Sequence, residues 1–257
     1  MRSYRQFATV YDRLMEDMPY PKWLRFMREC WDRYGIPSTV VDLGCGTGSI
    51  AIPLAHSGFH VYGIDLSADM LTIARQKWEE TPQQAIRSHG GTIRWLQQDM
   101  RNWQLPGEVD AAVSFCDCLN YITEQEDVEA AFRATYRGLK EGGVFLFDVH
   151  PLKTLKDYAQ QQPFILDERD IAYLWTSEMD EERSEIEHNL TIFAKDPQDK
   201  EGRFVRIEET HVQRAYDSDW LESALLKAGF SKVERFADFQ LKLPLPSSER
   251  LFFAAVK

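Results

Sequence analysis

The segment VVDLGCGTGSI (residues 40–50) decides the fold. A short apolar run predicts a buried strand, and Asp-x-Gly-x-Gly-x-Gly follows before a helical pattern over residues 48–57. Glycines are needed where a backbone turns sharply and approaches a ligand without a Cβ in the way. The predicted helix directs its free N–H groups and its positive dipole end at this turn. We therefore expect the turn to hold an anionic group of a ligand.

Strand and helix signals alternate on both sides of this segment. Strands are predicted at 39–43, 60–65, 92–99, 109–116 and 144–150, and helices at 68–80 and 124–140, the latter closed by the glycines of KEGG (140–143). A helix capped by Asp217 or Ser218 runs through Leu226, and strands 232–239 and 250–257 form a closing hairpin. This order predicts an α/β fold with a doubly wound, mostly parallel, seven-stranded sheet.

Two segments depart from the alternation. The first 35 residues read as helices. Residues 151–215 carry three runs of strand character, at 170–178, 185–195 and 203–216, with a loop at 196–202. Neighbouring strands with short connections predict an antiparallel insertion. We expect residues 1–150 and 216–257 to form one domain, into which 151–215 is inserted.

Composition disfavours several classes of protein. The 257 residues carry 30 basic and 41 acidic side chains, a net charge of −11, which argues against a nucleic-acid partner. The four cysteines lack metal-ligand spacing, so we expect no metal site and reduced thiols in the cytoplasm. No apolar run reaches the roughly 18 residues of a membrane span, and the N-terminus shows no secretory signal.

Two kinds of cofactor compete for the glycine turn. A dinucleotide site needs Gly-x-Gly-x-x-Gly. Counted from Gly44, the third glycine falls on Ser49; counted from Gly46, it falls on Ala51, which some dinucleotide sites tolerate. Asp42 helps to distinguish the two kinds of cofactor, because a carboxylate there repels the pyrophosphate of a dinucleotide but accepts a hydrogen bond from an ammonium group.

The segment resembles motif I of the class I S-adenosylmethionine-dependent methyltransferases. The segments YRQFATVYDRLM, CDCLNY, LFDVHP and ETHVQRAY extend the likeness over nearly the whole chain, to a group of poorly characterised bacterial methyltransferases. This resemblance implies that residues 1–35 form an N-terminal helical cover and that S-adenosylmethionine is the cofactor. It also implies that Asp42 faces the amino group of the cofactor, directly or through water. It also implies that the cofactor is lined by the backbone of the glycine loop, at Gly44, Cys45, Gly46 and Gly48.

Positions farther along the chain complete the predicted cofactor site. Asp65 ends the second strand, where a carboxylate accepts from both hydroxyls of a ribose. Leu66 and Met70 follow and are placed to sandwich the adenine, although core packing also accounts for Met70. The resemblance further implies that Asp99 accepts from the adenine amine and that the N–H of Met100 meets the ring.

The acceptor side is predicted from elements around the crevice. Cys116, Asp117 and Asn120 follow the fourth strand and should lie near the donor methyl. Tyr11 is expected to close over the cofactor, although its spacing also suits an ordinary apolar helix face. Further candidates, each with a structural reading left open, are His150 and His211 as proton acceptors and Tyr173 and Trp175 as a cation–π box for an amine.

Together these features predict transfer of a methyl group to an N or O atom of a small-molecule acceptor. The Asn/Asp-Pro-Pro-aromatic motif of base-amine methyltransferases and the Pro-Cys of cytosine C5 enzymes are absent. Methylation of RNA or protein, and a non-catalytic regulatory module that binds the cofactor, stay as alternatives. The sequence leaves the oligomeric state open between monomer and homodimer.

Overall fold

The computed structural model describes residues 2–80, 90–196 and 202–257, and for residues 2–6 only the backbone. The predicted loop 196–202 therefore lies largely outside the described residues. The helices are α1 (Arg2–Leu14), α2 (Tyr20–Tyr34), α3 (Ala51–His56), α4 (Ala68–Glu80), α6 (Gln125–Gly138), α7 (Leu152–Gln161) and α8 (Ser218–Ala228), with a 3₁₀ turn η1 (Cys118–Tyr121).

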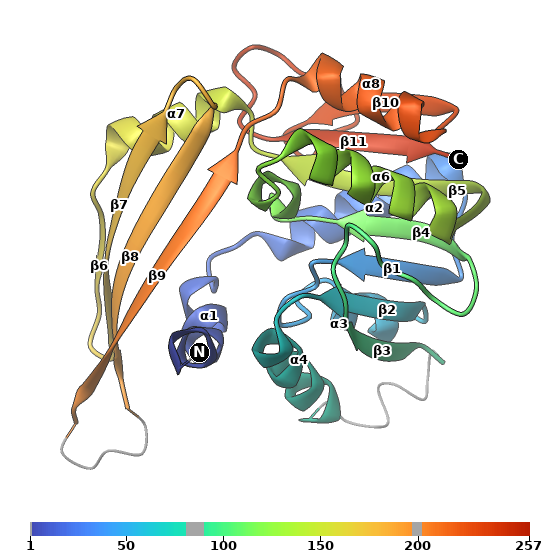
Figure 1. The fold of residues 1–257 in the computed structure, drawn as a ribbon. Helices are drawn as coiled ribbons and strands as arrows, with labels where there is room; N and C mark the ends of the chain where they lie inside the picture. Colours follow the sequence, from blue (N-terminus) through green and yellow to red (C-terminus); the bar gives the residue numbers. More distant parts are fainter. Residues whose placement is uncertain (1, 81–89, 197–201) are drawn as a thin grey trace.

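The main sheet of the described chain has seven strands in the order β10-β11-β5-β4-β1-β2-β3 (Figure 1). These are β1 (Thr39–Leu43), β2 (His60–Asp65), β3 (Thr92–Gln97), β4 (Val109–Ser114), β5 (Leu139–Val149), β10 (Lys232–Ala237) and β11 (Leu251–Val256). Strands β1 to β5 are parallel, whereas β11 runs antiparallel to β5 and to β10. The predicted doubly wound sheet and its closing hairpin are confirmed.

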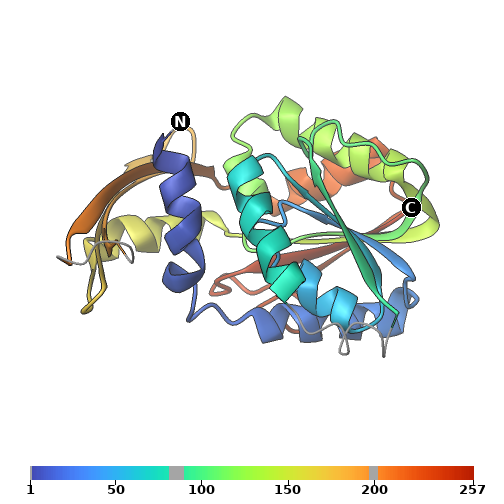
Figure 2. The same cartoon turned by 90° about the horizontal axis from the view of Figure 1, so that it is seen from below.

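Helices cover both faces of this sheet because successive strand residues point to opposite sides. Phe145 and Phe147 of β5 pack in one apolar cluster with α6 and α8. Leu146, between them, packs in a second cluster with α2 and α3. Figure 2 shows these two pairs of helices on opposite sides of the sheet. The carboxyl ends of the five parallel strands consequently share one edge, where the glycine loop lies.

The insertion forms a sheet of its own, and here the sequence prediction was incomplete. Its strands are β6 (Phe164–Asp167), β7 (Ile171–Asp180), β8 (Glu185–Lys195) and β9 (Phe204–Arg214), each antiparallel to its neighbour. Four strands are present where three were predicted, and helix α7 was not predicted at all. The signal for helix α7 was present in the sequence, because Leu152, Leu155 and Tyr158 recur at helical spacing.

Helix α1 lies between the two sheets (Figures 1 and 2). Phe7 and Ala8 of α1 share an apolar cluster with Met70 of α4 and with Ile192 and Ile207 of the second sheet. The Asp12 carboxylate accepts from the Thr47 hydroxyl at 2.5 Å and from the Lys77 ammonium at 2.8 Å. The N-terminal cover thus joins the insertion to the strand edge that carries the glycine loop.

Several predicted boundaries were wrong by a few residues, for local reasons. The helix predicted over 48–57 begins at Ala51, because Gly48 has a positive φ of 85° and still belongs to the turn. Strand β4 ends at Ser114 rather than 116, since Cys116 and Asp117 adopt left-handed backbone angles. The KEGG segment falls inside β5 instead of closing the preceding helix. Within the described residues, no helix has the length and hydropathy to cross a membrane.

Asp217 caps α8, which settles the choice between Asp217 and Ser218. Its carboxylate accepts from the backbone N–H groups of Asp219 and Trp220, at 2.9 and 3.0 Å. Asp217→Ala should lower the free energy of unfolding by about 1 kcal/mol, because two N–H groups of the first turn lose their acceptor. Urea unfolding measures this, with Asp219→Asn as the control. Asp219 is 80% exposed, so its ion pair contributes little. Equal losses in both variants would contradict the capping role.

Candidate active site

The glycine loop turns back at the end of β1 and is held by β2. The N–H groups of Gly44 and Cys45 donate to the carbonyl of Ile64, at 2.8 and 3.0 Å. The Gly46 N–H donates to the Asp65 carboxylate at 2.8 Å. Gly44, Gly46 and Gly48 all have positive φ, a conformation that strains any residue with a side chain.

The three glycines of the loop are required for different reasons. A Cβ built at Gly44 would lie 2.1 Å from the Sγ of Cys118, and one at Gly48 would lie 2.8 Å from the ring of Trp95. These two positions are small because side chains of the protein pack against them. A Cβ at Gly46 would meet no protein atom within 4 Å, so Gly46 faces open space. At Gly46, therefore, a ligand can approach the backbone without meeting a side chain.

Asp42 is buried directly behind the loop. It is 3% exposed, and its Oδ2 has no hydrogen-bond partner in the described structure. Burial, reinforced by the nearby charge of Asp65, raises the pKa of Asp42 to about 7. An unpartnered buried carboxylate oxygen costs free energy unless a donor reaches it. This geometry fits a ligand that brings an ammonium group to the loop.

The acids that follow β2 and β3 differ in their surroundings. Asp65 accepts from the N–H groups of Gly46 and Ser67, and burial raises its pKa. Asp99 is bound by the guanidinium of Arg101, which lowers the pKa of its carboxyl. Arg101 also pairs with Asp127 at 2.6 Å. Asp99 thus faces its cavity as an ionised carboxylate already held by a cation.

Two cavities meet above the strand edge. A smaller one of about 340 Å³ lies between the ends of β2 and β3 and the turn η1, and Asp99 and Met100 line it. A larger one of about 970 Å³ extends from the glycine loop to α1 and the second sheet. Residues common to both linings are Gly44, Asp65, Leu66, Cys118 and Tyr121. An elongated ligand can therefore occupy both at once.

The structure brings most of the predicted residues to the larger cavity. Those that line it are Tyr11, Gly44, Gly46, Asp65, Leu66, Met70, Cys116, Asp117, His150, Tyr173, Trp175 and His211. Four other predicted residues, Asp42, Cys45, Gly48 and Asn120, lie in the shell behind the linings. Asn120 is 0% exposed, and its amide donates to the carbonyls of His150 and Arg214 and accepts from the His150 N–H. These bonds join η1 to β5 and β9, which is a structural role.

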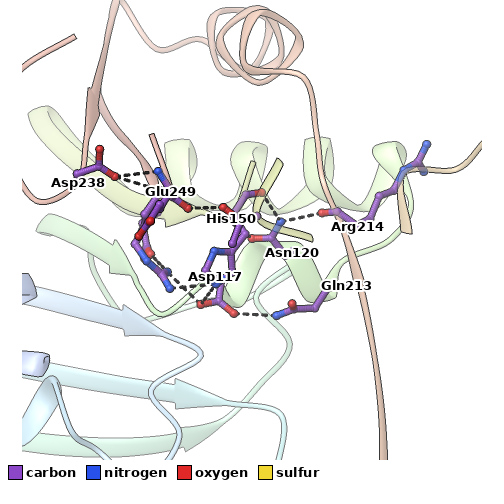
Figure 3. A network of polar contacts seen from close by, with 10 residues as sticks. Asp117, Asn120, His150, Gln213, Arg214, Asp238 and Glu249 are labelled. Carbon is purple, nitrogen blue, oxygen red and sulfur yellow. Dashed lines mark hydrogen bonds and ion pairs between the residues drawn. The ribbon is translucent and has the colours of Figure 1, made fainter. Parts of the chain in front are cut away.

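A polar network spans the far wall of this cavity (Figure 3). The Asp117 carboxylate contacts the His150 Nε2 at 3.1 Å, the Arg250 guanidinium at 3.0 Å and the Gln213 amide at 2.7 Å. Burial would raise the pKa of Asp117, but His150 and Arg250 outweigh it and hold the pKa well below its usual range. Arg250 also pairs with the fully buried Asp148. Asp117 therefore stays ionised, with both oxygens engaged by the protein.

Sequence reasoning missed three members of this wall: Arg250, Gln213 and His188. Arg250 directly precedes β11, where Leu251 pairs with Val149, so the register alone sets it beside His150. His188 is 4% exposed and lies on β8 among inward apolar residues. Its Nδ1 accepts from the Trp175 indole at 3.0 Å. The signal available in the sequence was a polar residue at an inward position of an alternating strand.

Comparisons with known proteins agree with this geometry. Residues 40–143 match a family described as a methyltransferase domain. Over 257 residues the chain is 37% identical to "Putative methyltransferase GWCH70_2453" of Geobacillus sp. (strain WCH70), covering 99% of this chain and 100% of that protein. The chain therefore belongs to the class I S-adenosylmethionine-dependent methyltransferases.

More particular likenesses cover the whole length. "Putative methyltransferase YqeM" of Bacillus subtilis (strain 168) is 37% identical over 255 residues, covering 99% of this chain and 97% of that protein. The crystal structure of an S-adenosylmethionine-dependent methyltransferase from Clostridium acetobutylicum ATCC 824 superposes with a TM-score of 0.83. It is 27% identical and covers 98% of each chain.

Two more distant structures share the fold. The sugar N-methyltransferase KedS8 from Streptoalloteichus sp ATCC 53650 has a TM-score of 0.67 at 19% identity, covering 90% of this chain and 84% of that one. The glycopeptide N-methyltransferase MtfA, crystallised with S-adenosylmethionine, has a TM-score of 0.56 at 18% identity, covering 89% and 84%.

S-adenosylmethionine is the cofactor of this enzyme class, and the site suits it. The bare backbone at Gly46 and the unpartnered oxygen of Asp42 are the features that an amino-acid tail with an ammonium group would use. When bound, the cofactor supplies a methyl carbon activated by its sulfonium. Among the described residues, no cluster of histidine, cysteine and acidic side chains has the makeup of a metal site.

Replacing Asp42 by Asn should separate stability from ligand binding. Because burial raises the pKa of Asp42 to about 7, its stabilising contribution is fully present below about pH 4, the ordinary pKa of an aspartic acid, and is lost as pH rises from there to about 7. Without ligand, Asp42→Asn should therefore unfold at a higher temperature than the parent at pH 8, and this difference should shrink steadily as pH falls toward 4. Its affinity for S-adenosylhomocysteine should fall at least tenfold, by about 1.4 kcal/mol.

Thermal unfolding with and without S-adenosylhomocysteine measures both effects. Asp157→Asn is the control, because Asp157 forms a surface pair with Lys153 on α7, away from the loop. An Asp42→Asn variant that binds S-adenosylhomocysteine like the parent at pH 8 would rule out the role of Asp42.

Proposed function

We propose that this enzyme transfers the methyl group of S-adenosylmethionine to an N or O atom of a small-molecule acceptor in the cytoplasm. One observation carries the proposal. The large cavity continues beyond the glycine loop and is walled on the far side by α1 and the inner face of the second sheet. A partly open, mostly apolar cavity of about 970 Å³ has the size at which small molecules bind.

Within this proposal, the cofactor spans both cavities. Asp42, in the shell behind the lining, receives its amino group through a water molecule, Gly44 and Gly46 line its tail with their backbone, and Asp65 accepts from the ribose hydroxyls. Asp99, Met100 and Leu66 surround the adenine in the smaller cavity, and Met70 lies against it from the larger one. Tyr11 and Cys116 close over the sulfonium from the larger cavity. The inner part of the larger cavity, with Asp117, Tyr173 and Trp175, is left for the acceptor.

The charge and the shape of the site support a small acceptor over the alternatives. A net charge of −11 disfavours RNA, which binds by displacing counterions onto basic side chains. A regulatory module without turnover needs no room beyond the cofactor, whereas this cavity continues past it. The sugar N-methyltransferase activity of KedS8 supports an amine acceptor by analogy of fold alone.

Label transfer tests the proposed function. The protein is incubated with S-adenosylmethionine labelled in its methyl group and a Bacillus subtilis extract divided into small-molecule, RNA and protein fractions. We expect label in the small-molecule fraction, and none when the same fraction is incubated with S-adenosylhomocysteine in excess. Label confined to RNA or protein, or binding of cofactor with no transfer, would overturn the proposal.

The ribose contact yields a quantitative prediction. Asp65→Ala should weaken binding of S-adenosylhomocysteine by about 2–3 kcal/mol, because it removes charge-assisted hydrogen bonds to the ligand and the acceptor of the Gly46 N–H. Isothermal calorimetry measures the loss, and Glu79→Gln on the exposed side of α4 should bind like the parent. Parent-like affinity in Asp65→Ala would place the ribose elsewhere.

A further inference from the structure

Three histidines line the larger cavity: His150, His188 and His211. Two of them are held by other side chains through their ring nitrogens. The Nε2 of His150 lies 3.1 Å from Asp117 and 3.0 Å from the Arg250 guanidinium, and its Nδ1 is buried without a hydrogen-bond partner. The Nδ1 of His188 receives the Trp175 indole N–H, Ser177 lies 2.8 Å from it, and the ring also forms a hydrogen bond with Gln213. The ring of His188 and the Nε2 of His150 are therefore engaged by the protein, and burial keeps the Nδ1 of His150 out of reach of a ligand in the cavity.

His211 is positioned differently. It projects from β9 opposite His188 and is held by ring contacts alone, to Phe7 of α1 at 5.5 Å and to Tyr121 of η1 at 5.9 Å. Within the described part of the chain, no hydrogen bond to either nitrogen of His211 is formed. Tyr121 lines both cavities, so His211 stands beside the place where they meet.

Burial favours the neutral form of His211. The titratable groups on neighbouring elements are His188 across the sheet, Tyr121 of η1 and Tyr11, which contacts Phe7 on α1. Glu209 lies two positions away on the same face and has contacts of its own. Burial lowers the pKa of His211, and burial lowers that of His188 to about 4. At neutral pH the ring of His211 is therefore uncharged and able to accept a proton.

We propose that His211 is the general base that takes the proton from the acceptor during methyl transfer, a role that rests on the proposed function. The acceptor N or O atom uses a lone pair to form the bond to the methyl carbon. The electrons of the broken carbon–sulfur bond stay on sulfur, which becomes a neutral thioether. The proton of the acceptor passes to a ring nitrogen of His211, and the resulting imidazolium releases it to water. The acceptor class is thus a neutral primary or secondary amine or a hydroxyl group, whose attacking atom has a lone pair and still carries a proton that must leave.

Chemical modification reads out this role without any turnover. Diethyl pyrocarbonate acylates neutral, accessible imidazoles, and mass spectrometry of peptides gives the rate at each histidine. With S-adenosylhomocysteine present, His211 should react at least about tenfold faster than His150 and His188, with a pH midpoint below about 6.5, the value of an unperturbed histidine. A rate as slow as that of His188, or a midpoint above 6.5, would overturn the proposal.

A variant tests the catalytic part. His211→Gln should bind S-adenosylhomocysteine like the parent but transfer label to the small-molecule fraction about 10²–10⁴-fold more slowly, with partial rescue by added imidazole. His60→Gln, on an exposed position of β2, should match the parent in both assays. Parent-like transfer by His211→Gln would show that His211 is not the base. If the parent itself labels no small molecule, the proposed function fails and this role fails with it, whatever the modification rates.

Discussion

The bond from the Gly46 N–H to the carboxylate of Asp65 is the constraint on which the site depends. It ties the turn after β1 to the end of β2, so that the backbone at Gly46 is held open toward the cavity. The same carboxylate lines both cavities, which makes it at once a support of the loop and a contact surface for the ligand. A second acid, Asp42, lies behind this turn with one oxygen unpartnered. The loop therefore carries an electrostatic cost that a cationic ligand relieves.

The far wall of the larger cavity is held together by polar contacts. The Asp117 carboxylate pairs with His150 and Arg250 and accepts a hydrogen bond from the Gln213 amide, which belongs to the second sheet. Buried charges of this kind fix relative positions, because removing one partner leaves another uncompensated. Asn120 ties η1 to β5 and β9 by bonds to the backbone alone. Together these contacts place the inner face of the insertion opposite the glycine loop.

Helix α1 completes the enclosure. It is fixed by apolar packing against Met70 and the second sheet, and by the Asp12 carboxylate that accepts from Thr47 and Lys77. One side of α1 therefore touches the glycine loop, and the other touches the second sheet. Helix α1 bridges the glycine loop and the second sheet, and the larger cavity lies in the space that remains between them.

The sequence by itself determined the seven-stranded sheet, the glycine turn and the acids at the strand ends. These are local features: alternation of apolar residues, glycines at fixed offsets and a carboxylate after each strand depend only on near neighbours. It missed α7, although the apolar residues of this helix recur at helical spacing, and it missed β6, which has only four residues. It also missed Arg250, Gln213 and His188, because their role arises from contacts between distant segments. Only the tertiary structure decided which histidine keeps its nitrogens free, because hydrogen-bond partners such as Asp117 for His150 and Trp175 for His188 are chosen by packing and not by spacing along the chain.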